Sequence, residues 1–324
     1  MTTQRIDSLE SIDVDGTALW VLLRGNPAAR RVLLLVQQGP GLPLIHEAAA
    51  IEQRLRLESN FVVAYWDQRG TGKSSKADSN TIDVGRLVAD VSSMVAALCV
   101  RLNVDHVDLV GFSLGATLAT MAVAENPARI GHVIAVGIDV DFAESERHAY
   151  AFACQEAAKR GDTRAQRQLA EIGPPPHDTS AKFLTRVQWV TTYGGIHRGQ
   201  AFLGNVWANV WRLLSSPHYS LVEAVQSLQA IERTQGLMLK HLEHFDLRAI
   251  VSRVEVPIAF FQGRHDFATP PDLVASYVDG LGATHGKSLE WFEESAHMPH
   301  FEEPGHFRDA QVRSLRAAPH AQAA

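Results

Sequence analysis

The sequence predicts an α/β fold: a mostly parallel sheet flanked by helices, with an inserted helical lid domain. Two observations lead to this class. Short apolar runs alternate with longer segments of helical periodicity over much of the chain, and one internal block of about 100 residues has helical periodicity throughout. The length of 324 residues is sufficient for one large domain with an insertion.

The strands of the sheet are predicted at short runs rich in Val, Leu, Ile and Phe. In chain order these runs are residues 19–23, 32–36, 61–65, 107–110, 133–136, 258–261 and 288–292. A run that is apolar at nearly every position is typical of a strand buried on both faces. We therefore expect helices to cover both sides of the sheet.

Helices are predicted between these runs, most clearly at residues 84–102 and 114–125. The alternation stops near residue 140, and strand-like sequence returns only at Val256-Pro257-Ile258-Ala259-Phe260-Phe261. We expect residues 1–140 and 246–316 to form the main domain, residues 141–245 to form a lid over one end of the sheet, and residues 317–324 to be a flexible tail.

Composition restricts the partners. Thirty Lys and Arg against 36 Asp and Glu leave a formal charge of −6, and no basic block marks a nucleic-acid or anionic-membrane surface. No apolar run approaches the ~20 residues that cross a bilayer, and the first ten residues do not resemble a secretion signal. We expect a cytoplasmic protein that acts on a small molecule or short peptide; the oligomeric state is open.

The strongest chemical motif lies after the strand at 107–110. Gly111-Phe112-Ser113-Leu114-Gly115 follows a buried strand and precedes a helix of small residues. This context is typical of a sharp turn that exposes a nucleophilic serine at the positive end of a helix. We predict Ser113 as the nucleophile and expect Phe112 to contact the substrate.

A serine nucleophile needs a base, and the base needs an orienting carboxylate. His297, in Ser295-Ala296-His297, is the predicted base, with His300 as the alternative. Asp266, in Gly263-Arg264-His265-Asp266 after the strand at 258–261, is the predicted acid; Asp139 and Asp141 compete for that role. The order Ser, Asp, His along the chain is that of the α/β-hydrolase arrangement.

Acyl transfer also needs two N–H groups that bind the developing oxyanion. We predict one at Leu114, directly after the nucleophile, and the other in the turn Gln38-Gly39-Pro40. Pro40 has no N–H, so Gly39 is the first choice and Gln38 the second. The preceding amide, Gln37, is predicted to face the substrate.

Several motifs together resemble the α/β-hydrolase superfamily, and more narrowly its proline iminopeptidase branch. They are Gln-Gln-Gly-Pro-Gly at 37–41, Asp-Gln-Arg-Gly-Thr-Gly-Lys-Ser at 67–74, Gly-Phe-Ser-Leu-Gly at 111–115, Gly-Arg-His-Asp at 263–266 and Ser-Ala-His at 295–297. The family pattern before Pro-Gly is usually His-Gly-Gly, so Gln37 and Gln38 are departures. The loop at 67–74 is expected to be structural, braced by an Arg–carboxylate pair.

The resemblance implies a serine hydrolase without metal or organic cofactor. Trp189, Tyr193 and Trp207 are the aromatic lid residues predicted to contact the substrate, with the core of the lid as their alternative place. A proline aminopeptidase would need a lid carboxylate for the substrate amine; the candidates Glu144, Glu171, Glu223, Glu232 and Glu243 are equally well read as solvated helix positions. A carboxylesterase or lactonase is the alternative activity. Rival classes are a C–C bond hydrolase or lyase and a ligand receptor.

Overall fold

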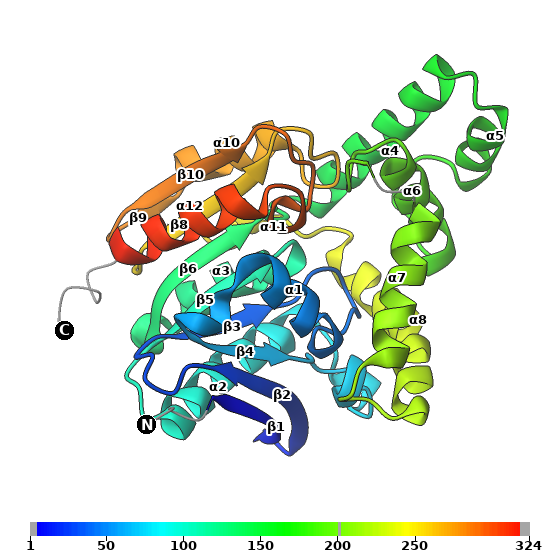
Figure 1. Ribbon diagram of the computed structural model, residues 1–324. Helices are drawn as coiled ribbons and strands as arrows, with labels where there is room; N and C mark the ends of the chain where they lie inside the picture. The colour runs from blue at the N-terminus through cyan, green and yellow to red at the C-terminus, as the bar shows by residue number, and fades with distance from the viewer. Residues whose placement is uncertain (1–4, 200–201, 318–324) are drawn as a thin grey trace.

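The structure is a computed structural model that describes residues 5–199 and 202–317. An eight-stranded sheet runs through the molecule in the order β1-β2-β4-β3-β5-β6-β8-β10 (Figure 1). Its strands are β1 (Ile6–Val14), β2 (Thr17–Gly25), β3 (Val32–Val36), β4 (Val62–Trp66), β5 (Val107–Phe112), β6 (Ile130–Val136), β8 (Ile258–Gly263) and β10 (Lys287–Phe292). A small parallel pair, β7 (Arg253–Val254) and β9 (Gly282–Ala283), lies apart from it.

Strands β4, β3, β5, β6, β8 and β10 pair in parallel, and the two pairs at one edge, β1–β2 and β2–β4, are antiparallel, so β2 alone runs in the opposite direction. Strands β3, β4, β5, β6 and β8 are buried along their whole length, as their apolar sequences predict. The predicted fold class is confirmed. Strand β1 was not predicted, because its alternating, half-polar sequence suits an edge strand that is only partly buried.

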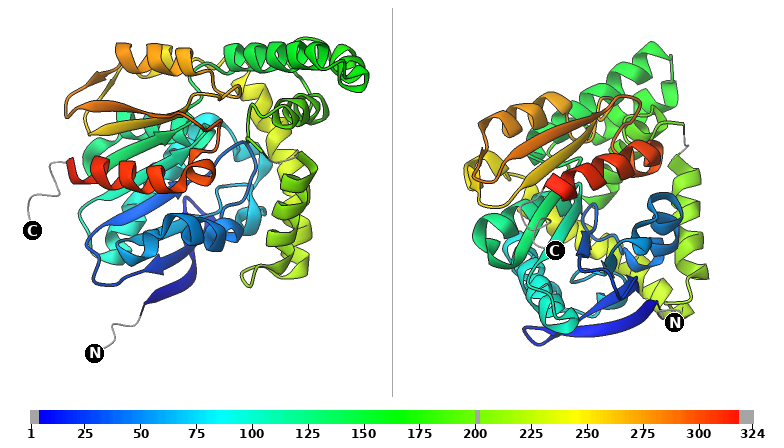
Figure 2. Two further views of the ribbon diagram at one scale, coloured as in Figure 1. Left: turned by 45° about the horizontal axis from the view of Figure 1, so that its top comes forward. Right: turned by 60° about the vertical axis from the view of Figure 1, so that its left-hand side comes forward.

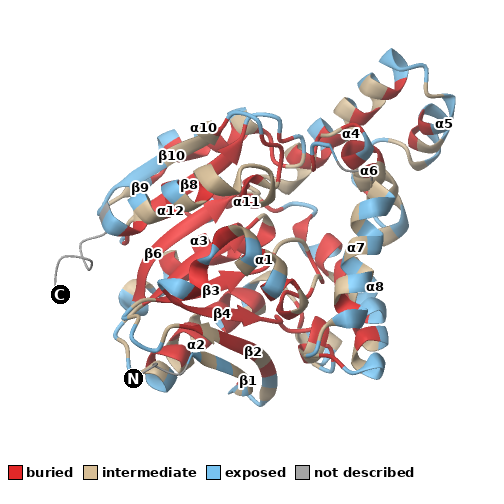
Figure 3. Ribbon diagram, viewed as in Figure 1, coloured by how far each residue is buried: buried red, intermediate tan, exposed pale blue. Residues whose placement is uncertain are grey.

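Helices cover both faces of the sheet (Figures 1 and 2). One face carries α2 (Val84–Leu102), α3 (Leu114–Glu125) and α10 (Pro271–Gly280), and the other carries α1 (Ala48–Leu55) and α12 (Pro304–Ala317). The buried strands and these inner helix faces form the two layers of the core (Figure 3). The short helices are α9 (Leu247–Ile250) and α11 (Pro299–Glu302).

Between β6 and β7 the chain forms a helical insertion. It consists of α4 (Phe142–Lys159), α5 (Thr163–Ile172), α6 (Ser180–Thr192), α7 (Phe202–Ser215) and α8 (Leu221–Leu242). The insertion lies beyond the edge of the sheet where the parallel strands end (Figure 1). At its neck, Asp141 and Asp246 form an antiparallel backbone bridge. The expected tail at 317–324 falls outside the described residues from 318 onward.

Candidate active site

Ser113 lies at the turn between β5 and α3. Its backbone has φ 53° and ψ −124°, a conformation that residues with a side chain rarely adopt. Its N–H donates a hydrogen bond to the Val136 carbonyl at 2.8 Å, which ties the turn to the neighbouring strand β6. A sharp strand-to-helix turn of this kind presents the serine hydroxyl above the sheet edge.

Two glycines allow this turn to close. A β-carbon on Gly111 would lie 2.5 Å from the Ala116 Cα, and a β-carbon on Gly115 would lie 2.3 Å from the carbonyl oxygens of Val36 and Gln37. No β-carbon tolerates such distances to backbone, so both positions require glycine. The contact at Gly115 also brings the turn at residues 37–41 against the first turn of α3.

Leu114 belongs to one of the two segments that meet here, the start of α3, and Gly39 belongs to the other, the turn at residues 37–41. Leu114 is the first residue of α3, where the helix leaves N–H groups without intrahelical acceptors and carries a partial positive charge. Gly39 has φ 61°, which favours glycine, and Gln38 beside it is half-buried. The turn that contains Gln38 and Gly39 thus adjoins the first turn of α3, which begins at Leu114.

Gln37 is placed differently from the expectation that it faces the substrate. Its side chain is buried, its Oε1 accepts a hydrogen bond from the Gln68 N–H at 3.3 Å, and its Nε2 donates to Thr71 Oγ1 at 3.5 Å. Both ends of the amide are thus engaged by the loop at 67–74. Gln37 braces the turn from the scaffold side.

That loop has the predicted internal brace. The Arg69 guanidinium binds the Asp90 carboxylate through two hydrogen bonds of 2.7 and 2.9 Å, and both side chains are buried. Asp67 accepts hydrogen bonds from the N–H groups of Leu44, at 2.8 Å, and Lys73, at 2.8 Å, and from the Tyr219 hydroxyl. Asp67 thereby joins the main domain to the start of α8.

Asp266 and His297, the predicted acid and base, are in direct contact. His297 Nδ1 lies 2.7 Å from Asp266 Oδ2, and both side chains are buried. Asp266 is held in turn by the N–H groups of Ala268 and Thr269, each at 2.8 Å, and by Thr269 Oγ1 at 2.7 Å. Gln262 Nε2 donates a further bond at 3.1 Å. The carboxylate is therefore rigidly aimed at the imidazole.

Gly137 lies between the segments that carry His297 and Ser113, the predicted base and nucleophile. It follows Val136, the residue that binds the Ser113 N–H, and a β-carbon on it would lie 3.0 Å from both Cε1 and Nδ1 of His297. Within the described residues, Ser113 and His297 form no direct hydrogen bond. Each instead contacts the segment Val136-Gly137: the Ser113 N–H bonds Val136, and the His297 ring lies against Gly137.

The insertion also contacts the two loops that carry Asp266 and His297. The N–H of His297 donates to the Ile196 carbonyl at 3.1 Å, and the N–H of Phe267, next to Asp266, donates to the Gly195 carbonyl at 2.9 Å. The Phe267 ring stacks on Phe152 of α4 with centroids 3.8 Å apart. None of these supports was predicted. The contact of Gly195 with Phe267, about 70 residues later in the chain, leaves no local pattern in the sequence.

Electrostatics favour protonation of His297. Burial lowers the pKa of its imidazole, but the charge and hydrogen bond of Asp266, assisted by Asp139 and Glu302, outweigh burial and raise the pKa above 6.5. The net shift shows that the carboxylates around the ring stabilise the imidazolium. Such stabilisation suits a base that becomes charged when it takes a proton from a serine.

The competing residues have other contacts. His300 packs between Phe112 and Phe301, with centroids 4.4 and 4.3 Å away, and burial lowers its pKa to about 3. Asp141 caps α4 by accepting the Glu144 N–H at 2.9 Å, and it pairs with Arg248. Neither therefore takes the place of His297 or Asp266. Phe112, predicted to contact the substrate, is buried against His300.

Asp139 lies next to the pair without joining it. Its carboxylate accepts the Ser145 hydroxyl at 2.9 Å, and burial raises its pKa to about 6, opposed by that bond and by His297. It also faces a buried cluster in the insertion, in which Arg186 binds Glu146 and His177 Nδ1 lies 3.0 Å from the second Glu146 oxygen. Burial lowers the pKa of Arg186 to about 9, opposed by Asp139.

The aromatic residues of the insertion divide between its core and its surface. Trp189 stacks on Tyr193 with centroids 5.8 Å apart; the Trp189 indole donates to Gln168, and the Tyr193 hydroxyl donates to Asp162. Both rings belong to the core formed by α4, α5 and α6, which was the alternative to substrate contact. Trp207, in contrast, is 69% exposed on α7.

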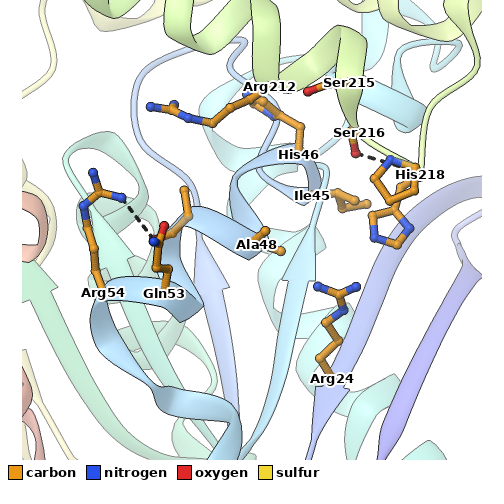
Figure 4. Close-up of a pocket in the computed structure, with 13 residues that line it drawn as sticks. Arg24, Ile45, His46, Ala48, Gln53, Arg54, Arg212, Ser215, Ser216 and His218 are labelled. Carbon is orange, nitrogen blue, oxygen red and sulfur yellow. Dashed lines mark hydrogen bonds between the residues drawn. The ribbon is translucent and has the colours of Figure 1, made fainter.

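A basic groove of about 460 Å³ lies between α1 and the end of α7. Figure 4 shows Arg54 and Gln53 of α1 on one side and Arg212 of α7 above, with His46 between them. Ser113, Asp266 and His297 are not among its lining residues. Arg212 Nη1 donates to Glu47 Oε1 at 2.7 Å, so this face of α7 is tied to the main domain.

Among the residues described, no group of His, Cys, Asp and Glu has an arrangement that could hold a metal ion.

Comparison with known proteins gives a consistent result. Residues 32–304 match the family described as alpha/beta hydrolase fold. The chain is 24% identical to the "Probable aminopeptidase YbaC" of Bacillus subtilis over 312 residues, 95% of this chain and 96% of that protein. It is 23% identical to the "Proline iminopeptidase" of Heyndrickxia coagulans over 253 residues, 75% and 77% of the two chains. These relatives confirm the resemblance to the proline iminopeptidase branch.

Among solved structures, an esterase from Exiguobacterium antarcticum superposes with a TM-score of 0.63 at 17% identity, covering 96% of this chain and 100% of that one. At this identity the likeness shows the fold alone. No helix in residues 5–199 or 202–317 combines the length and apolarity needed to cross a membrane.

Proposed function

We propose that this chain, which belongs to the α/β hydrolase fold family and is a hydrolase, cleaves a small ester or amide through a covalent acyl-enzyme on Ser113. The observation that carries the proposal is the left-handed backbone of Ser113 next to Gly137, against which the Asp266-bound ring of His297 lies. A strained serine, a buried imidazole and an orienting carboxylate supply the three parts that nucleophilic acyl transfer needs.

The proposed reaction has two halves. His297 Nδ1 is engaged by Asp266, so Nε2 removes the hydroxyl proton as Ser113 Oγ attacks the substrate carbonyl. The tetrahedral oxyanion is bound by the N–H groups of Leu114 and Gly39, with Gln38 as the alternative donor. His297 then gives the proton to the leaving amine or alcohol, and the acyl group remains on Ser113.

In the second half, His297 takes a proton from water, and the resulting hydroxide attacks the acyl carbonyl. The same N–H groups bind the second oxyanion, and collapse of this intermediate breaks the bond to Ser113 Oγ. His297 returns the proton to the serine, and a carboxylic acid leaves. The chain's own side chains provide every proton transfer in this scheme.

Two substrate classes follow from the comparisons. The relatives named as an aminopeptidase and a proline iminopeptidase support an N-terminal prolyl amide as the substrate. Such a substrate carries an ammonium group, and a carboxylate of the insertion would be needed to bind it. Support for this class therefore depends on a carboxylate that is available.

The contacts of the glutamates of the insertion favour the second class, a carboxylesterase or lactonase. Glu223 is paired with Lys73 at 2.6 Å, Glu144 faces Arg248, and the buried Glu146 is bound by Arg186 and His177. The remaining candidates are exposed on the insertion: Glu171, Glu232 and Glu243. A buried, unpaired carboxylate is therefore not found among these six.

The experiment compares prolyl-p-nitroanilide with p-nitrophenyl esters of increasing chain length, using wild type and Ser113→Ala. We expect kcat on every substrate to fall by about 10³-fold or more in a folded Ser113→Ala protein. Preference for the prolyl amide would assign the aminopeptidase, and activity on esters alone would assign the esterase. Full activity in Ser113→Ala would contradict the proposal.

A further inference from the structure

Exposed apolar side chains are concentrated on one helical hairpin. Thirteen large apolar side chains are exposed in the described part of the chain, and nine of them belong to α7 and α8. On α7 they are Leu203, Val206, Trp207, Trp211 and Leu214; on α8 they are Leu221, Val222, Val225 and Leu228. The five on α7 are called the α7 face below.

The α7 face points away from the molecule. Its members recur at three- and four-residue intervals, so they share one side of the helix. The opposite side carries Arg212, which binds Glu47. Leu213, at the edge of the face and seven residues after Val206, is only 2% exposed, so the boundary with the main domain lies there. Figure 4 shows Arg212 directed toward the side of α1. The tryptophans are 69% and 71% exposed on the far side.

The α7 face reaches the upper end of the apolar patch sizes that a monomer ordinarily exposes. At about 70% exposure, the two tryptophans alone present on the order of 300 Å². The largest apolar patch of a typical monomer is about 300–600 Å² in total. The five side chains of the α7 face present on the order of 600 Å², and the four exposed on α8 add on the order of 400 Å², against the roughly 800 Å² that each partner contributes to a standard protein interface.

From this surface we infer that a second copy of this chain packs on the α7 face, related to the first by a twofold axis. The charge distribution selects this occupant. Arg212 is the single charged residue in the sequence of α7, and Glu47 binds it. An uncharged face places no like charges opposite each other when it meets its own copy. It also offers no charge to a charged partner.

The spacing of the face fits a helix as its partner. Leu203, Trp207, Val210 and Leu214 follow each other at intervals of four, three and four residues. This is the a/d spacing by which two helices interlock side chains along a common seam. A helix that is apolar nearly all round is typically buried all round. Packing α7 against α7 of the partner would bury its second side.

Sedimentation velocity of the full-length wild-type protein between 1 and 100 µM tests the inference. The expected species is a dimer of about 71 kDa, twice the 35.5 kDa chain. The double variant Leu203→Glu/Trp211→Glu, at side chains that are 65% and 71% exposed, should place four charges in the interface and sediment as a monomer. It should retain thermal stability and ester or amide turnover, because neither side chain contacts the catalytic residues.

Val100→Glu is the matched control, since Val100 is 77% exposed on α2, far from the hairpin in sequence. It should remain dimeric. A wild-type protein that is monomeric at 100 µM would overturn the inference, as would a dimer that persists in the folded double variant. A monomer that co-sediments with neutral phosphatidylcholine vesicles would also overturn it and assign the face to lipid.

Discussion

The backbone of Gly137 lies directly against the imidazole of His297. A β-carbon on Gly137 would be 3.0 Å from the ring atoms Cε1 and Nδ1 and 3.5 Å from Asp266 Oδ2. Gly137 also has φ 54°, a backbone region in which side chains are unfavourable. One residue that lacks a side chain thus defines the space in which the acid–base pair sits.

Gly137→Ala is expected to lower kcat/KM by about 10- to 100-fold, because the added methyl group displaces the imidazole from Ser113. Steady-state kinetics on the preferred substrate measure this effect. Gly161→Ala is the control: Gly161 has φ 62°, but a β-carbon there would meet nothing within 4 Å. Each variant should lose about 1–2 kcal/mol of stability from backbone strain. Equal kinetics in the two variants would contradict a role for Gly137 in positioning His297.

The pH dependence of kcat/KM should report the pKa of His297. A protonated imidazole cannot accept the serine proton, so activity is lost as pH falls through the raised pKa, and the acid limb should have its midpoint above 6.5. Asp266→Asn removes the charge that raises the pKa of His297 against the effect of burial. The acid limb of the pH profile of this variant should therefore move to lower pH, and kcat should fall by about 10⁴-fold. An unchanged limb in this variant would assign the titration to another group.

Gln38→Gly tests the side chain next to the proposed oxyanion donor. We expect a change in kcat or in acyl-chain preference, because a half-buried amide beside Gly39 would narrow the acyl site. Stability should change little. Gln37→Ala is the contrasting variant: it removes the bonds to Gln68 and Thr71 and should cost about 1 kcal/mol of unfolding free energy. Unchanged kinetics across several esters would make Gln38 a turn residue only.

The buried pair of Arg186 and Glu146 should behave as a unit. Arg186→Leu leaves the buried Glu146 carboxylate without its cation, so we expect a loss of about 3 kcal/mol of unfolding free energy in urea. The double variant Glu146→Leu/Arg186→Leu removes both charges and should recover most of that loss. Additive losses in the double variant would show that the two side chains do not depend on each other.

Local sequence determined the main parts of the fold and of the candidate site. The apolar runs identified β3, β4, β5, β6 and β8, because a strand buried on both faces must be apolar at nearly every position. Ser113 was identified by the glycines at 111 and 115, because the sharp turn leaves no room for a side chain at either position. Asp266 and His297 each follow a strand that ends at the same sheet edge, and the structure brings them within 2.7 Å.

Tertiary structure alone decided the rest, since it depends on which surfaces dock. Trp189 and Trp207 are the same residue type in helices of the same insertion, so the sequence does not distinguish them. Trp189 fills the core of the insertion, whereas Trp207 is exposed because only one side of α7 packs on the molecule. Gly137, Thr269 and Ile196 support Asp266 or His297 through contacts that no local pattern encodes. A residue's type restricts the chemistry it can perform, but the packing of distant segments decides which group it meets.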